Sequence, residues 1–192
     1  MKTNLLNKTV SSEKAFSGFL SGDAKRFLIR IGIVYGIYKI AFFIIWRIPE
    51  LTQLHENIVV RFIRFIINNV HFLLNQLNYQ FISLNLDERI IRIANSGGVR
   101  VSPPCSGLDI MFWFSVIIFT YPAKITRKII FVLSGIVIIH LLNISRITAL
   151  TLLSYHAPEW VEINHKLIFN IIVYSTILLI WLKFINDKKT MV

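Results

Sequence analysis

The sequence contains a single cysteine, Cys105, and charged residues make up only 16% of its 192 positions. One thiol excludes an intramolecular disulfide, a cysteine-rich metal site and a dithiol redox enzyme, which needs a second cysteine in the chain. The scarcity of charge excludes an ordinary soluble domain, because a soluble chain of this length needs more polar surface. With 55% hydrophobic residues, the composition instead predicts an all-α polytopic membrane protein.

Acidic residues are also few: 10 Asp and Glu stand against 21 Lys and Arg, which gives a formal charge of +11. The basic residues flank apolar runs and form no polar domain of their own, so nucleic acid is not expected as a partner. Residues 1–26 lack the apolar core of a cleavable signal peptide. We expect them to form a cytoplasmic segment, followed by a single transmembrane domain at 27–185 and a cytoplasmic tail at 186–192.

Four apolar runs come close to the roughly 20 residues that a membrane-spanning helix requires. They cover about 27–46, 105–121, 129–150 and 167–185. Lys and Arg concentrate in the first 30 residues, in the loop at 122–128 and in the tail, which indicates that both termini and this loop are cytoplasmic. The segments 47–104 and 151–166 are then expected on the outer side.

Residues 57–79 predict an amphipathic helix. One polar stripe recurs along it at steps of three and four: Arg61, Arg64, Asn68, His71, Asn75 and Asn78. Such a helix either lies in the membrane interface or packs against the other spans with its stripe inward. If it crossed the membrane completely, the count would rise from four spans to five and the basic N-terminus would lie outside, so we favour four.

A short β-hairpin is expected directly before the cysteine. In residues 89–102, apolar and polar positions alternate around Asn95-Ser96-Gly97-Gly98, a sequence typical of a tight turn. The ribbon should lie on the outer membrane surface beside Cys105. Its exposed edges offer an extended peptide a place to add as a further strand.

Three reactive residue types fall at one level of this topology: Cys105 begins the short span, Arg146 ends the next span and His165 opens the last. Cys105 is expected to start a helix, where the dipole and a nearby arginine lower the pKa of a thiol. His165, also near a helix N-terminus, should remain neutral and accept a proton. Arg146 needs a partner near hydrocarbon, and a thiolate, a carboxylate or an oxyanion meets that need.

Each of the three residues also has a simpler interpretation: a small buried packer for Cys105, a side chain that reaches the lipid headgroups for Arg146, and a solvated histidine for His165. Their coincidence at one level favours a site. A metal site built from His140, His156 and His165 is not expected, because the three lie on different faces and segments. No cofactor is expected either, and the sequence around Ser106 lacks the Gly-x-Ser-Gly pattern of a rhomboid-like serine protease.

The motifs "PPCSGLD", "NISRI" and the later His165 resemble the exosortase/archaeosortase family of membrane cysteine enzymes. The short chain and the hairpin before the cysteine look most like the F-type exosortases of Bacteroidetes. The resemblance covers residues 85–185 and implies Cys105, Arg146 and His165 as catalytic residues, with Gly107 and Asn143 in support. Two departures put the substrate type in question: Asp109 stands in place of a basic residue, and His165, in the sequence "NHKLIFN", is not followed by the Asp and later Gly of many relatives.

The resemblance further implies a multi-pass protein of the bacterial inner (plasma) membrane with its site at the periplasmic face. Its partners would be membrane lipids and exported proteins that end in a short motif, a membrane helix and a basic tail. Cys105 would form a thioester acyl-enzyme, and water or an amine on a surface glycan or lipid would resolve it. The alternative is a non-enzymatic assembly or transport component that uses Lys39, Arg61, Arg64 and Arg146 as polar contacts between helices.

Among the histidines, we expect His165 to be the base. His140 lies in mid-span, too deep to meet Cys105, and His156 lies in an outer loop before Pro158. A ring nitrogen of His165 should lie within about 4–6 Å of the Cys105 sulfur, with Arg146 at a similar range.

Overall fold

Long apolar helices make up most of the chain, for which the computed structural model describes residues 22–79, 81–82, 89–94 and 96–186. Four helical stretches are long and apolar enough to cross a membrane: Lys25–Arg47, Pro49–Gln76, Ile125–His156 and Pro158–Asn186. A shorter apolar helix, Leu108–Thr120, accompanies them. The predicted fold class, an all-α polytopic membrane protein with a small β element, is confirmed.

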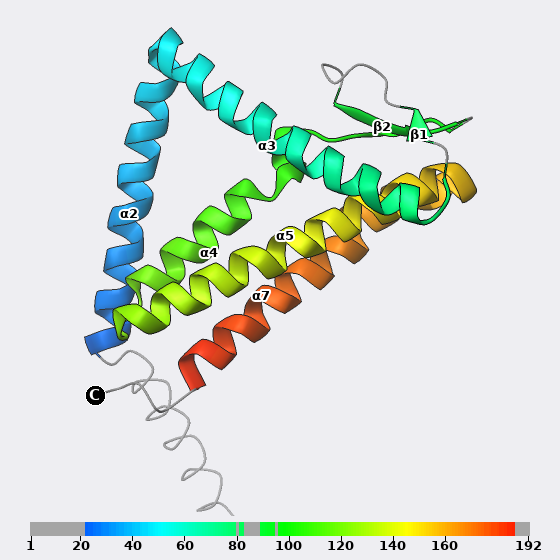
Figure 1. Ribbon diagram of the computed structural model, residues 1–192. Helices are drawn as coiled ribbons and strands as arrows, with labels where there is room; N and C mark the ends of the chain where they lie inside the picture. Colours follow the sequence, from blue (N-terminus) through cyan, green and yellow to red (C-terminus); the bar gives the residue numbers. More distant parts are fainter. Residues whose placement is uncertain (1–21, 80, 83–88, 95, 187–192) are drawn as a thin grey trace, which may run out of the picture.

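The helices α2 (Gly22–Arg47) and α3 (Pro49–Gln76) meet at a sharp bend. Ile48 has an extended backbone between them, and Pro49 opens α3, a position where its missing N–H costs no helical hydrogen bond. In Figure 1, α2 runs along the left edge and α3 leaves its upper end obliquely across α4 (Leu108–Thr120) and α5 (Ile125–His156). The amphipathic helix therefore begins earlier than the 57 expected from its polar stripe.

The apolar face of α3, and not its polar stripe, packs against the rest of the protein. Ile63, Ile66, Val70 and Leu74 are completely buried, whereas the stripe residues Arg61, Arg64, Asn68 and Asn75 are exposed. The buried face joins a cluster with apolar residues of the sheet and of α5, including Ile91, Val101 and Ile147. Of the two placements expected for this helix, the one with its stripe inward is wrong, because its apolar face packs into an apolar cluster.

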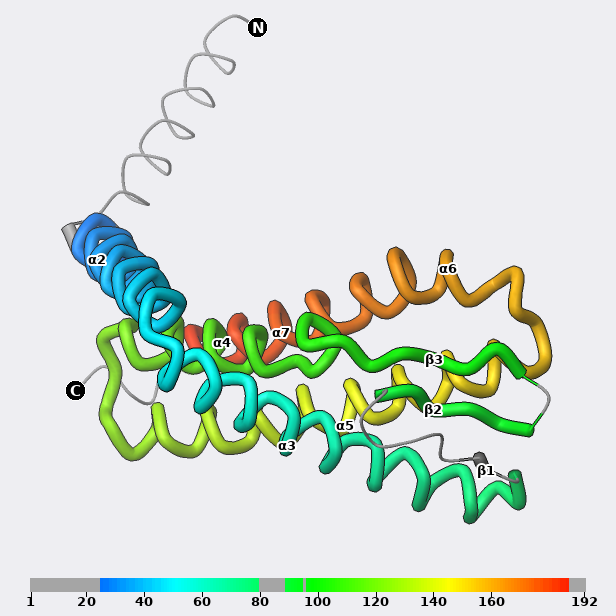
Figure 2. The backbone as a smooth tube through the Cα atoms, turned by 90° about the horizontal axis from the view of Figure 1, so that it is seen from above, coloured from blue at the N-terminus to red at the C-terminus, as the bar shows by residue number. Residues whose placement is uncertain are grey.

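The hairpin before the cysteine is confirmed as β2 (Ile90–Ile93) and β3 (Val99–Arg100), paired antiparallel. A further two-residue strand, β1 (Phe81–Ile82), pairs with β2 and extends the sheet to the order β1-β2-β3 (Figure 2). The turn requires glycine at position 98, because its φ is +75° and an added Cβ would lie 2.9 Å from the Ile91 carbonyl oxygen.

The helices α4, α5 and α7 (Phe169–Asn186) form a second apolar cluster. Phe114 of α4 is almost completely buried, and its ring lies where a Cβ on Gly135 of α5 would be, at 2.1 Å. A glycine at this position therefore allows the two helices to approach closely.

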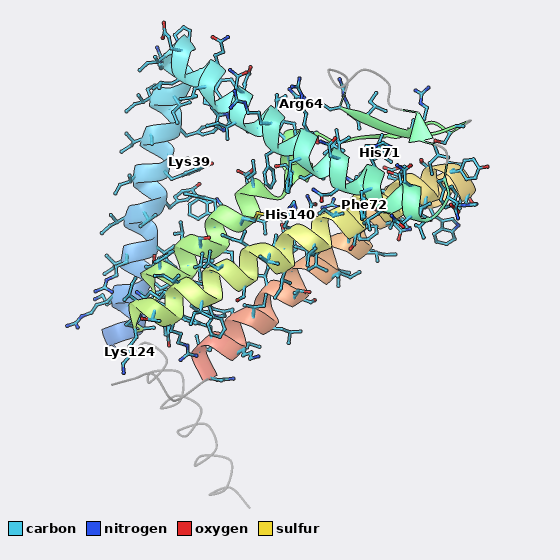
Figure 3. All side chains as sticks on the ribbon, in the orientation of Figure 1. Lys39, Arg64, His71, Phe72, Lys124 and His140 are labelled. Carbon is cyan, nitrogen blue, oxygen red and sulfur yellow. The ribbon has the colours of Figure 1, made fainter. Side chains whose placement is uncertain are left out.

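Basic side chains gather at one end of this bundle. Arg127 donates to the carbonyl of Phe184 at 2.6 Å, and Lys128 donates to the carbonyl of Phe119 at 2.8 Å. Both carbonyls belong to the last turns of helices, where positive charge is favourable. Figure 3 shows Lys124 at this same end, and Figure 1 shows the start of α2 and the end of α7 there too.

The last helical stretch starts earlier than the span expected at 167–185. A 3₁₀ turn η3 (Pro158–Trp160), α6 (Val161–Ile163) and a π-helical turn η4 (Asn164–Ile168) lead continuously into α7. On their exposed side, Lys166 pairs with Glu162 one turn away. These turns place His165 opposite the segment that carries Cys105.

Candidate active site

The segment around the cysteine is a single 3₁₀ turn, η2 (Pro103–Ser106), followed by Gly107. Gly107 has a φ of 78°, a left-handed conformation that ends the turn, and α4 begins only at Leu108. The sequence predicted that Cys105 starts an α-helix, and this prediction is wrong. The left-handed glycine separates the 3₁₀ turn that carries the thiol from the first turn of α4.

Buried hydrogen bonds hold this turn in place. Ser106, almost completely buried, donates to the carbonyl of Pro103 at 2.7 Å and accepts a hydrogen bond from the Leu108 N–H. Asn143 of α5, itself buried, donates through Nδ2 to the carbonyls of Cys105 at 3.1 Å and Ser106 at 2.8 Å. The two residues implied as supporting, Gly107 and Asn143, thus both shape the segment that presents the thiol.

The Cys105 sulfur has two polar neighbours. Nε2 of His165 lies 3.4 Å from Sγ, shorter than the range expected from the sequence. The Ser102 hydroxyl donates to the same sulfur at 3.2 Å. Cys105 is partly exposed, so the thiol is accessible while both neighbours remain in contact. The arrangement provides a nucleophile with a proton acceptor beside it.

Sequence reasoning did not identify Ser102. It lies three residues before Cys105, the spacing at which side chains meet on one side of a 3₁₀ turn. The Cys105 N–H donates to the Ser102 carbonyl at 2.9 Å, which closes that turn and brings the hydroxyl to the sulfur. The serine before the proline pair is visible in the sequence, but only the 3₁₀ turn η2 brings its hydroxyl to the sulfur.

Arg146 is buried in α5, and its guanidinium donates to the backbone carbonyl of His165 at 3.2 Å. This carbonyl lies within the π-helical turn η4, one turn inside the last helix and not at its N-terminus as expected. Single π turns are frequent at functional sites because they alter the regular hydrogen-bond pattern of a helix. The sequence indicated that Arg146 needs a polar partner near hydrocarbon, and this partner is the backbone carbonyl of His165.

The other histidines of the second half of the chain lie elsewhere. His140 lies midway along α5 (Figure 3). Its ring stacks on that of Phe65 of α3, with ring centroids 5.2 Å apart. His156 is the last residue of α5, and not part of a loop as expected, and its Nε2 lies 2.8 Å from the Tyr79 hydroxyl. Among the described residues, no three His, Cys, Asp or Glu side chains are grouped as metal ligands would be.

Comparison with known protein families places most of the chain within one family model. The family described as transmembrane exosortase matches residues 31–182, a range that runs from α2 into α7 and includes Cys105, Asn143, Arg146 and His165. No curated protein and no solved structure matches the chain at a significant level.

Proposed function

The chain belongs to the transmembrane exosortase family, and we propose that it is a cysteine peptidase or transpeptidase that cleaves C-terminal sorting signals of exported proteins. The observation that carries this proposal is the 3.4 Å contact between the Cys105 sulfur and Nε2 of His165. A thiol at hydrogen-bond range of an imidazole is the arrangement that generates a nucleophilic thiolate. We also assign the chain to the F-type exosortases, on the hairpin before the cysteine.

In the first step, His165 accepts the thiol proton through Nε2, and the Cys105 sulfur attacks the carbonyl carbon of the scissile peptide bond. The tetrahedral intermediate then collapses, the C–N bond breaks, and His165 returns the proton to the leaving amine. The N-terminal part of the substrate remains on the enzyme as a thioester of Cys105. The released part is the membrane helix with its basic tail.

Arg146 serves this reaction in two ways. By donating to the His165 carbonyl, it fixes the helical turn that aims the imidazole at the sulfur. Its positive charge, held in a buried position beside the reacting groups, also favours the negative charge that develops on the thiolate and on the oxyanion. Asn143 acts through the turn, because its two hydrogen bonds fix two consecutive carbonyls, that of Cys105 and that of Ser106.

In the second step, a nucleophile attacks the thioester carbonyl and releases the thiol. Water gives hydrolysis, and an amine on a cell-surface glycan or lipid gives transfer. We place this site at the periplasmic face of the bacterial inner membrane, because the basic end of the bundle, with Lys124, Arg127 and Lys128, lies opposite to it.

The test is to determine, by mass spectrometry, the C-termini of exported proteins that end in an apolar helix and a basic tail. These proteins are expressed with the wild type, with Cys105→Ala or with His165→Ala, and membrane insertion of each variant is verified by immunoblotting. We expect shortened C-termini only with the wild type. Shortened C-termini in Cys105→Ala cells would refute the proposal.

A non-enzymatic membrane component remains the rival, and the buried position of Arg146 as a link between α5 and η4 is the observation that favours it. In that case Cys105→Ser would have no effect, because serine fits the space of the thiol and keeps every contact of Arg146. The enzyme proposal instead requires that Cys105→Ser stop processing while the protein remains in the membrane.

A further inference from the structure

The strand that leads to the cysteine, β3, has a free edge. Directly after the antiparallel ladder of β2 and β3, the Val101 N–H donates to the Arg89 carbonyl at 2.8 Å and so points to the side of β2. Residues alternate along such a ladder, so the neighbouring pair, Ile90 and Arg100, is non-hydrogen-bonded. The N–H and C=O of Arg100 therefore point away from β2.

Within the described part of the chain, the sheet ends at β3, and no strand pairs with it on this side. Figure 2 shows β3 between β2 and the helical stretch that begins at α6, with α5 beneath. The Val101 side chain is buried in the cluster below, so the sheet is anchored and its edge has a fixed position. An edge strand with unpaired backbone groups is a template for a further strand.

The edge points to the reactive pair. From Arg100 to Cys105 the chain takes three extended steps and two 3₁₀ steps, which together amount to about 14 Å. An extended peptide covers that distance in about four residues. A peptide that runs beside β3 thus brings a carbonyl to the Cys105 sulfur, with His165 on its other side.

We propose that the substrate binds as a fourth strand, parallel to β3, with the residue beside Arg100 about four positions before the scissile carbonyl. This inference rests on the proposed function. The direction follows from the order of a sorting signal: the residues before the cleavage site lie along the sheet, and the membrane helix after it continues beside α4 toward the basic end. In a parallel pair, the Arg100 N–H and C=O bond to the two residues that flank the one beside it.

The same geometry assigns a side-chain preference. Ile91, Ile93 and Val101 occupy the buried face of the sheet, so Arg92 and Arg100 lie on the opposite face. Arg100 is exposed. The substrate residue beside Arg100 points to this face, and an acidic side chain there pairs with the Arg100 guanidinium.

The experiment uses peptide chloromethyl ketones on the full-length protein in detergent. The Cys105 sulfur displaces chloride, so that an S–C bond forms, the C–Cl bond breaks and the thiol proton passes to His165. The chain has one cysteine, so peptide mapping by tandem mass spectrometry assigns a thiol adduct to Cys105 and separates it from alkylation of His165. The probe is acetyl-Val-Glu-Thr-Val-Ala chloromethyl ketone, whose Glu is the fourth residue from the reactive end. Chloroacetone, which carries the reactive group without a peptide, gives the rate in the absence of strand contacts. The rate of each variant with the peptide is divided by its rate with iodoacetamide, which corrects for differences in thiol reactivity.

Arg100→Pro and Arg100→Ala form the matched pair. Both lose the guanidinium, but only proline removes the outward N–H, and proline is tolerated at an edge strand where the N–H faces away from the ladder. We expect the normalised rate with the peptide to be about fivefold lower in Arg100→Pro than in Arg100→Ala. The Glu-to-Lys peptide should react more slowly with the wild type and recover with Arg100→Glu.

A second measurement does not depend on any protein variant. With the wild type, N-methylation of the third residue from the reactive end should remove the rate advantage of the peptide over chloroacetone. N-methylation of the fourth residue should have little effect, because only alternate N–H groups of the peptide face β3. Equal rates for Arg100→Pro and Arg100→Ala, together with equal effects of the two N-methyl groups, would overturn strand addition. Failure of the proposed function looks different: His165→Ala would then react with iodoacetamide and chloroacetone as fast as the wild type.

Discussion

Replacement of Asn143 tests whether processing depends on the conformation of the turn that carries Cys105, because it leaves both reacting groups in the chain. Its amide touches neither the sulfur nor the imidazole, and it holds the turn through the carbonyls of Cys105 and Ser106. Asn143→Leu keeps a side chain of similar length on α5 but removes both donors. The thiol and its histidine remain in the chain, so any loss of processing reflects their alignment.

The magnitude follows from the two bonds. A typical intramolecular hydrogen bond contributes about 1 kcal/mol net, so the loss of two costs about 2 kcal/mol. If the whole cost falls on the aligned form of the turn, the population of that form decreases roughly 30-fold, since about 1.4 kcal/mol corresponds to a factor of ten. The Ser106 carbonyl bond is buried, and an unsatisfied carbonyl there raises the cost further.

The assay compares the rate of substrate processing with the thermal unfolding of the protein in detergent. We expect Asn143→Leu to process at least tenfold more slowly while it still unfolds cooperatively. Ser145→Ala on the exposed side of the same helix, where the hydroxyl bonds only to the Leu141 carbonyl, is the control and should process normally. Processing by Asn143→Leu within twofold of the wild type would refute the positioning role.

Three other changes test separate parts of the structure. Gly135→Ala forces a methyl group into a buried phenylalanine ring of α4 and should cost about 1–3 kcal/mol of stability. The control Gly36→Ala, with no atom within 4 Å of the added Cβ, should cost none. Equal melting temperatures of the two variants would contradict this packing of α4 against α5. Ser102→Ala removes the hydroxyl that donates to the thiol at 3.2 Å and should slow alkylation by iodoacetamide severalfold at neutral pH; an unchanged rate against pH would exclude a role for that hydroxyl. His156→Ala should retain processing and lose about 1 kcal/mol of stability through its bond to Tyr79, which lies shortly after α3. His165→Ala should abolish processing; the reverse result would show that the base was wrongly assigned.

The long elements could be predicted because their signals are local. A run of twenty apolar residues, or a turn sequence such as Asn95-Ser96-Gly97-Gly98, is recognisable from neighbouring residues alone. The structure has helices at the apolar runs and a hairpin around the turn sequence. The two-residue strand β1 could not be predicted, since two residues have no periodicity and only pairing with β2 defines them. Which face of α3 is buried depends on the surface that this helix packs against, and that surface is apolar.

The same distinction holds at the site. The motifs indicated which residue types come together, and His165 does lie beside Cys105. The hydroxyl of Ser102 and the carbonyl partner of Arg146 could not be inferred, because the first requires the 3₁₀ turn of η2 and the second requires a π turn. Neither turn has a distinctive sequence, and each is stabilised by contacts between elements remote in the chain.

The central claim is that Cys105 forms a thioester with the substrate, and hydroxylamine tests this most directly. Hydroxylamine attacks thioesters faster than water does and leaves a C-terminal hydroxamate on the released protein, which mass spectrometry distinguishes from a carboxylate. With a processed substrate and the wild type, we predict a hydroxamate at the new C-terminus, and no cleavage with Cys105→Ala. A new C-terminus that carries only a carboxylate at saturating hydroxylamine, or cleavage by Cys105→Ala, would contradict the account.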